Sequence, residues 1–229
     1  MKIAVFGLDV PVGKQKYVCQ CFNELVEKFV PQKVTPYAVE FIGDDFDKAD
    51  AVIFDSARKF DFLFIDLDKV ETRLQRTADE KERVVLAKAQ QLLEKEVLLF
   101  EADLAPDEKE LIKQLQFVSL KPCMGAASAG DMNGLIKAVM EKAGEILFFT
   151  AGKKEVHAWD IKLGDNAVTA AGRIHSDLAR GFIKAEIVNC RQLDKFFNMA
   201  EARAKGLVKA VDRDYVMEPG DIIEVKFSV

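Results

Sequence analysis

The chain has 229 residues, of which 49% are hydrophobic and 31% charged, and its formal net charge is −5 at pH 7. This is the composition of a globular protein, and no apolar run reaches the roughly 18 residues of a membrane-spanning helix. Two histidines exclude a histidine-rich metal site, and the acidic balance excludes a strongly basic nucleic-acid footprint. We therefore expect neither a membrane nor DNA as a partner.

The amino-terminal sequence MKIAVFGLD contains one lysine and an apolar run too short for the core of a signal peptide, and it has no small-residue cleavage site. The four cysteines lack the spacing of a zinc knuckle or a redox C-x-x-C motif. Small buried thiols in a reducing compartment are the better interpretation. The sequence thus predicts a cytoplasmic protein with no metal site.

The first part of the chain predicts an α/β domain. Residues 2–6 (KIAVF) form an apolar run that ends at Gly7, which is typical of a buried strand entering a turn. Residues 15–29 place apolar side chains on one helix face, and residues 37–42 and 51–54 look like further strands. This order indicates a small parallel sheet, on which we expect the helix to pack.

The middle of the chain predicts a helical hairpin. Residues 68–100 read as one long, highly charged helix, and Pro106 with the acids after it is a typical first turn of another. This second helix, residues 108–116, should fold back on the first. Such an arm is either a solvated structural element or a docking surface, and the sequence favours the structural element. A short helix is expected at residues 133–142.

From residue 146 onward the pattern changes to period-two segments. Residues 155–161, 183–188 and 222–227 predict strands of one sheet, and residues 193–204 predict a helix across it. Such a mixture within about 80 residues indicates an α+β grasp fold. The expected domains are therefore an α/β domain (1–67 and 119–145), a helical hairpin arm (68–118) and a β-grasp domain (146–229).

Residues 148–188, FFTAGKKEVHAWDIKLGDNAVTAAGRIHSDLARGFIKAEIV, closely resemble the TGS domain of the YchF subfamily of Obg-like ATPases. The tail RDYVMEPGDIIEVKFSV is similar to the ending of that family, and residues 65–74 and 106–122 are similar to the start and end of its helical arm. The resemblance thus covers essentially the whole chain. It implies a reduced P-loop-like parallel sheet with a helical-hairpin insertion, followed by a ubiquitin-like TGS domain.

A P-loop of the form G-x-x-x-x-G-K-[ST] curls its backbone N–H groups around phosphate, while its lysine binds phosphate and its hydroxyl binds Mg²⁺. The degenerate counterpart here retains Gly7, Gly13 and Lys14, but one extra residue separates the glycines and Gln15 replaces the hydroxyl. An amide is a poor ligand for Mg²⁺.

Two further positions depart from the family pattern. Gly43 stands where the resemblance implies a metal-binding aspartate, and Ser128 stands at the asparagine of the base-reading N-x-x-E. We therefore expect a shortened, non-catalytic chain with no catalytic residues and no cofactor. The alternative is a divergent NTPase that binds ATP or GTP with Mg²⁺ weakly through Gly7, Gly13 and Lys14.

The resemblance implies a binding or regulatory module whose partner is a translation-related RNA, the ribosome or a protein. A basic patch could serve this role if the strands bring its members to one face. Separate solvated charges are the competing interpretation, and a homo-oligomer that packs through the same face is a third. The candidate partner-binding residues are Lys153, Lys154, Arg173, His175, Arg180 and Lys184.

Overall fold

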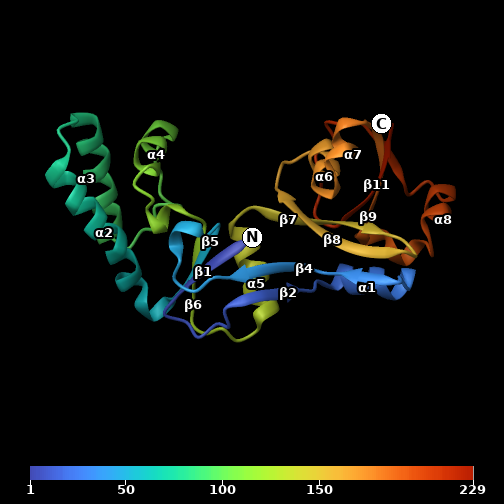
Figure 1. Cartoon of the computed structure of the whole chain (residues 1–229), viewed down its shortest axis with the longest axis horizontal. Helices are drawn as coiled ribbons and strands as arrows, with labels where there is room; N and C mark the ends of the chain where they lie inside the picture. Colours follow the sequence, from blue (N-terminus) through green and yellow to red (C-terminus); the bar gives the residue numbers. More distant parts are fainter. Residues whose placement is uncertain (229) are drawn as a thin grey trace. The chain divides into compact units, whose positions relative to one another are not determined.

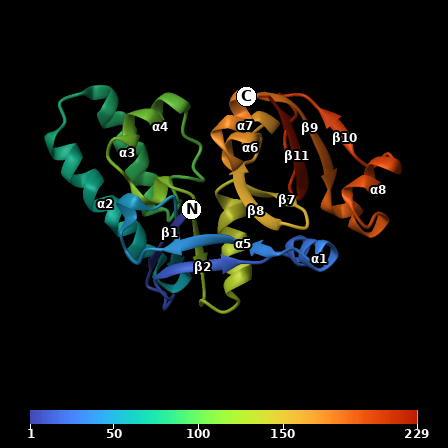
Figure 2. The ribbon, with the colours of Figure 1, turned by 45° about the vertical axis from the view of Figure 1, so that its right-hand side comes forward.

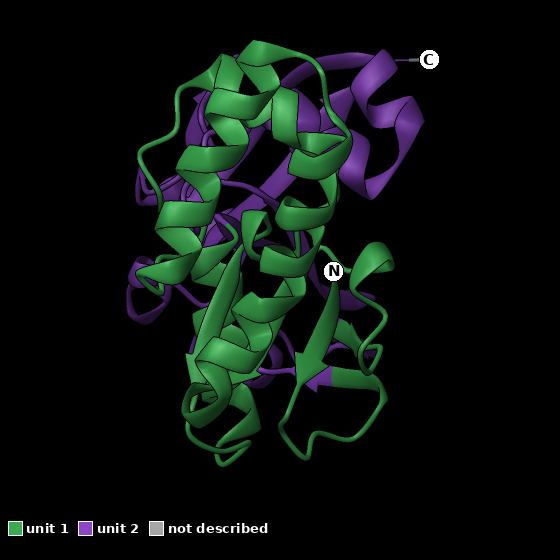
Figure 3. Cartoon of the chain, turned by 90° about the vertical axis from the view of Figure 1, so that its left-hand side faces the viewer, with its two compact units in different colours: residues 1–15, 39–143 green, residues 16–38, 144–229 purple. Residues whose placement is uncertain are grey.

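The computed structural model describes residues 1–228 (Figure 1). The chain forms two compact units, which Figure 3 colours separately: unit 1 comprises Met1–Gln15 and Val39–Ala143, and unit 2 comprises Lys16–Ala38 and Gly144–Val229. Residues 16–38, expected in the amino-terminal α/β domain, thus lie in unit 2, and the helical arm lies within unit 1. Among the described residues, no helix has the length and apolarity needed to cross a membrane.

The first sheet has five strands in the order β2-β4-β1-β5-β6. Strand β1 pairs in parallel with β4 and β5, and β5 pairs in parallel with β6. Four of the five residues of β5 are fully buried, as is typical of a parallel sheet covered on both faces. The predicted parallel sheet is confirmed. Its strands are β1 (Lys2–Phe6), β2 (Gly13–Tyr17), β4 (Tyr37–Phe41), β5 (Ala51–Asp55) and β6 (Cys123–Ala126).

The predicted single helix over residues 68–100 is wrong. Helix α2 (Lys59–Arg76) starts earlier, and α3 (Glu80–Glu94) packs beside it as a hairpin, as Figure 2 shows. The break arises because the Asp79 carboxylate accepts hydrogen bonds from the N–H groups of Lys81 and Glu82, which caps a new helix. Helix α4 (Pro106–Lys113) then packs against α3, so the predicted fold-back is present.

Asp66 anchors α2 to the segment that follows the arm. Its buried carboxylate accepts hydrogen bonds from the N–H groups of Val118 and Ser119, both at 2.7 Å. Burial raises the pKa of this carboxyl. The segment is the 3₁₀ turn η3 (Val118–Leu120), and α5 (Met132–Lys142) confirms the short helix expected nearby. Two further 3₁₀ turns are η1 (Phe46–Lys48) and η2 (Ser56–Arg58).

Unit 2 contains a six-stranded sheet in the order β10-β9-β11-β7-β8-β3. The antiparallel pairs β7–β8 and β9–β11 meet where β7 and β11 run parallel, which is the β-grasp arrangement. The three strands expected in one sheet are therefore confirmed. The strands are β3 (Lys33–Thr35), β7 (Glu145–Ala151), β8 (Glu155–Lys162), β9 (Phe182–Asn189), β10 (Lys209–Val211) and β11 (Asp221–Phe227).

The helices on this sheet differ from those predicted. Helix α6 (Ala167–Ile174) packs closely on the sheet, because its buried alanines allow close approach to Phe148 and Ile187. The short helix α7 (Ser176–Arg180) follows it. The prediction that residues 193–204 form this helix is wrong. That region is a 3₁₀ turn, η4 (Cys190–Lys195), followed by the short α8 (Met199–Ala204).

Helix α1 (Gln20–Phe29) is the largest departure from expectation. The prediction that it packs on the amino-terminal sheet is wrong, since it contacts β7, β8 and η4 in unit 2. The Phe22 ring lies 6.3 Å from the Phe149 ring between centroids, and Phe22 and Leu25 are buried. The apolar face was thus correctly identified, but its packing partner is the second sheet.

Candidate functional site

The segment that aligns with a P-loop has the wrong secondary structure for one. Gly7 directly follows β1 with φ +74°, and Gly13 opens strand β2 with φ +118°. In a P-loop the lysine leads directly into a helix whose N-terminal N–H groups face the phosphate. Lys14 instead lies exposed on a strand, and the next helix begins at Gln20. These residues therefore present no helix N-terminus to a phosphate.

The space beside Gly7 is closely lined by side chains. A Cβ atom placed on Gly7 would lie 3.2 Å from both Arg58 Cδ and Asp55 Cβ. The Arg58 guanidinium lies over the Phe6 ring, 4.8 Å from its centroid, and Arg58 Nε lies 3.0 Å from the Asp61 carboxylate. A cation that is already paired thus borders the carboxyl end of β1.

Gly43, at the position of the expected metal ligand, has φ +65°, and its carbonyl accepts a hydrogen bond from the Val5 N–H at 2.6 Å. Of the neighbouring acids, Asp45 pairs with Lys48 at 2.7 Å, which holds the pKa of its carboxyl below the usual value. Across residues 1–228 no group of three or more His, Cys, Asp or Glu side chains is placed to hold a metal ion.

The segment aligned with the base-reading motif serves the fold. The Asp131 carboxylate accepts a hydrogen bond from the Asn133 N–H and caps α5, while Ser128 is exposed. The Lys121 ammonium donates to the carbonyls of Phe46 and Ala49, each at 2.6 Å. These polar groups already have partners that stabilise the local structure.

In unit 2 the candidate basic residues divide into separate groups. Lys153 and Lys154 occupy the turn between β7 and β8, and within residues 1–228 their exposed ammonium groups form no ion pair. Arg173 is bound by Asp160, with Nε 3.0 Å from Oδ1, and Arg180 is bound by Asp177. The two arginines are thus largely neutralised by adjacent carboxylates.

The remaining candidates do not complete one basic face. His175 Nδ1 accepts a hydrogen bond from the Asp177 N–H at 3.2 Å and so caps α7. Lys184 precedes Ala185, which is buried in the core beneath α6, so alternation along the strand directs Lys184 to the opposite face. The six residues therefore do not form a single patch.

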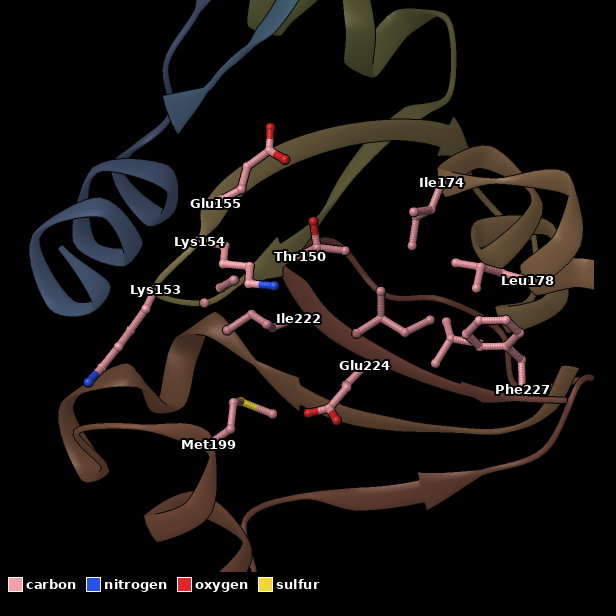
Figure 4. A pocket seen from close by; sticks show the side chains of 14 residues that line it. Thr150, Lys153, Lys154, Glu155, Ile174, Leu178, Met199, Ile222, Glu224 and Phe227 are labelled. Atoms are coloured by element: carbon pink, nitrogen blue, oxygen red, sulfur yellow. The ribbon is translucent and has the colours of Figure 1, made fainter. Parts of the chain in front are cut away.

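A pocket of about 530 Å³ opens in unit 2 beside the two lysines (Figure 4). It lies where β7 and β11, bridged at Phe149 and Ile222, diverge. Sequence patterns did not reveal it, because the divergence of two paired strands has no local signature. Its polar lining includes Thr150, Glu155 and Glu224, and its apolar lining includes Ile174, Leu178, Met199, Ile222, Val225 and Phe227.

Comparison with known proteins places this architecture. Residues 146–228 match the family model YchF-GTPase_C, described as a protein of unknown function (DUF933). A curated relative, the ribosome-binding ATPase YchF of Buchnera aphidicola, is 26% identical over 270 residues, covering 94% of this chain and 70% of the relative. Residues 146–228 thus match a YchF family model, and the chain as a whole is similar to YchF proteins, which are Obg-like ATPases.

Two further YchF proteins define the extent of the similarity. The ribosome-binding ATPase YchF of Mycoplasma genitalium is 39% identical over 106 residues, which cover 46% of this chain but 29% of the relative. The solved YchF GTPase of Schizosaccharomyces pombe aligns with a TM-score of 0.79 at 18% identity, covering 99% of this chain and 97% of that one. This last comparison shows that the YchF fold is shared.

Proposed function

We propose that this YchF-like chain is a non-catalytic binding protein whose carboxyl-terminal TGS-type unit associates with the ribosome or another component of translation. The non-catalytic part of this proposal rests on strand β2, because Gly13 and Lys14 lie at the start of a strand and not at the start of a helix. Phosphoryl transfer depends on positioning and on charge stabilisation by loop, lysine and metal, so losing that geometry removes most of the chemistry.

The binding role is supported by the relatives, which are named ribosome-binding ATPases, and by where the similarity is concentrated. The family model matches residues 146–228, which lie within unit 2. Unit 2 also contains the pocket and the turn between β7 and β8 that bears Lys153 and Lys154. A protein that keeps this unit while its nucleotide site decays can retain association without hydrolysis.

The test has two arms. Purified chain is sedimented with ribosomes through a sucrose cushion with and without ATP or GTP, and phosphate release is followed with Mg²⁺ present. We expect co-sedimentation that nucleotide does not change, and phosphate release at the rate of buffer. Failure to co-sediment at low salt would contradict the ribosome association.

A divergent ATP- or GTP-binding protein is the second candidate, because Gly7 keeps a positive φ at the end of β1 and Lys14 is exposed. Calorimetry with each nucleotide and Mg²⁺ separates the two candidates. Hydrolysis that disappears in Lys14→Ala would establish the second candidate. The same substitution leaves the ribosome-binding role untouched, since Lys14 lies outside the carboxyl-terminal unit.

A further inference from the structure

Strand β11 has one complete side and one open side within unit 2. It pairs with β9 from Asp221 to Phe227, whereas its parallel pairing with β7 is limited to Ile222 opposite Phe149. Within residues 1–228, the stretch from Ile223 to Phe227 has no strand partner on the side away from β9. A strand presents main-chain N–H and C=O groups on both sides, so this open side can accept hydrogen bonds from an added strand.

The pocket beside this open side has apolar side chains on two faces. Ile174 of α6 and Leu178 of α7 line one face, and Met199, the first residue of α8, lines the other (Figure 4). Val225 and Phe227 continue the apolar lining along β11, and Phe227 is 44% exposed. An extended chain directs successive side chains to opposite faces, so its apolar residues would find partners on both.

The charged side chains at the pocket favour a ligand of one charge sign. Glu155 is paired with Lys33 at 2.8 Å, and Glu224 is bound by Arg203 and Lys226, so both carboxylates are already compensated. Figure 4 shows the Lys154 ammonium group among the lining side chains, whereas Lys153 lies at the rim with its side chain directed outward. With these two ammonium groups uncompensated among the described residues, the rim favours a negatively charged ligand.

We propose that this pocket binds an extended, acidic and apolar peptide segment of a protein partner, which adds as a strand to the open side of β11. Such strand addition takes affinity from main-chain hydrogen bonds and specificity from alternate side-chain pockets. A single-stranded RNA fits less well, because the lining offers only one aromatic ring, Phe227, for stacking among the described residues. The inference deepens the proposed binding role by naming a class of partner for the same unit.

The probe is a random heptapeptide library displayed on phage and selected on the immobilised full chain. Enriched sequences are synthesised with fluorescein, and their dissociation constants are measured by anisotropy. We expect alternating apolar residues with at least one aspartate or glutamate. Replacing alternate peptide N–H groups by N-methyl should weaken binding at least about tenfold, because strand addition needs those donors.

Charge reversal in the protein provides the matched comparison. Lys153→Glu with Lys154→Glu should raise the dissociation constants of the acidic peptides at least about tenfold. Lys184 is an exposed lysine of β9 outside the pocket, so Lys184→Glu should change these dissociation constants less than about twofold. Trp159 fluorescence reports the integrity of the fold. If the reversed variant loses that signal, Lys153→Gln with Lys154→Gln replaces it.

Three results would overturn the inference: no enriched peptide, binding that tolerates N-methylation, or equal binding to the charge-reversed chain. Binding of an oligouridylate that depends on the two lysines, without any enriched peptide, would assign the pocket to nucleic acid. Ribosome co-sedimentation tests the proposed function separately. Loss of sedimentation with peptide binding intact contradicts that function alone.

Discussion

Arg73 and Glu82 form a two-point ion pair across the junction of α2 and α3, with Nε 2.7 Å from Oε1 and Nη2 3.0 Å from Oε2. The Thr77 hydroxyl donates to the same carboxylate, and Asp79 caps the second helix beside it. The Glu82 side chain is only 11% exposed, so these partners act in a partly dehydrated setting. This cluster fixes the turn that makes the arm a hairpin.

Glu82→Gln should destabilise unit 1 at neutral pH by about 1–2 kcal/mol, a range that allows for the solvent screening of the half-exposed Arg73. Arg73 and Thr77 lower the pKa of Glu82 in the folded chain. A lowered folded pKa contributes stability that is present above the ordinary glutamate value and lost as pH falls through the folded value. The difference between parent and variant in urea unfolding should therefore shrink below about pH 4.5.

Glu80→Gln is the control for this prediction, since Glu80 lies exposed in the first turn of the same helix. It should shift the unfolding midpoint much less than Glu82→Gln at neutral pH. A Glu82 effect that stays constant down to pH 3 would show that packing, and not the ion pair, carries it.

Phe22→Ala should destabilise unit 2, because Phe22 is buried against Phe149 on β7. Truncating a buried phenylalanine typically costs about 3–5 kcal/mol. Hydrogen exchange resolves where the loss occurs, and protection should fall most in β7 and β8. Glu27→Ala, on the exposed side of the same helix, should leave protection unchanged. Greater loss in β1 and β5 would contradict the observed packing of α1.

The sequence located the elements better than it located their partners. The apolar stripe of residues 15–29 identified a buried face through Phe22 and Leu25, but periodicity carries no information about which sheet covers it. The start of α3 was available as Asp79 followed three residues later by Glu82, a capping pattern that the continuous charge of the region obscured.

Sites were harder to predict than elements, for a physical reason. The spacing of Gly7 and Gly13 indicated that the P-loop counterpart is degenerate. That its second half forms strand β2 depends on pairing with β4, which the spacing does not report. The neutralisation of Arg173 comes from Asp160, on a different element. Contacts between elements decide both features, and a single sequence does not report them.

Val30→Gly should stabilise the chain by roughly 0.5–1 kcal/mol, because relief of left-handed strain exceeds the entropy cost of glycine. Val30 ends α1 with φ +42° and ψ +60°, and its N–H donates to the Val26 carbonyl at 3.0 Å. This left-handed position favours glycine, because a β-branched side chain is strained there. Val30 is also 79% exposed, so little packing is lost. Thermal unfolding measures the gain, and Val34→Gly, within strand β3, should instead lower the midpoint.

The salt dependence of the proposed ribosome association would distinguish the two groups of basic residues. Each phosphate contact contributes about one unit to the slope of log affinity against log salt. Because Arg173 and Arg180 are held by Asp160 and Asp177, replacing both by alanine should change that slope by less than about half a unit. Lys153→Gln with Lys154→Gln should reduce it by up to about two units if phosphate is the contact, and by less if a carboxylate-bearing peptide is. Co-sedimentation from 50 to 300 mM salt, roughly the span over which phosphate contacts weaken, gives both slopes. A larger effect from the arginine pair would mean that these ion pairs open on binding and that α6 and α7 form the contact surface.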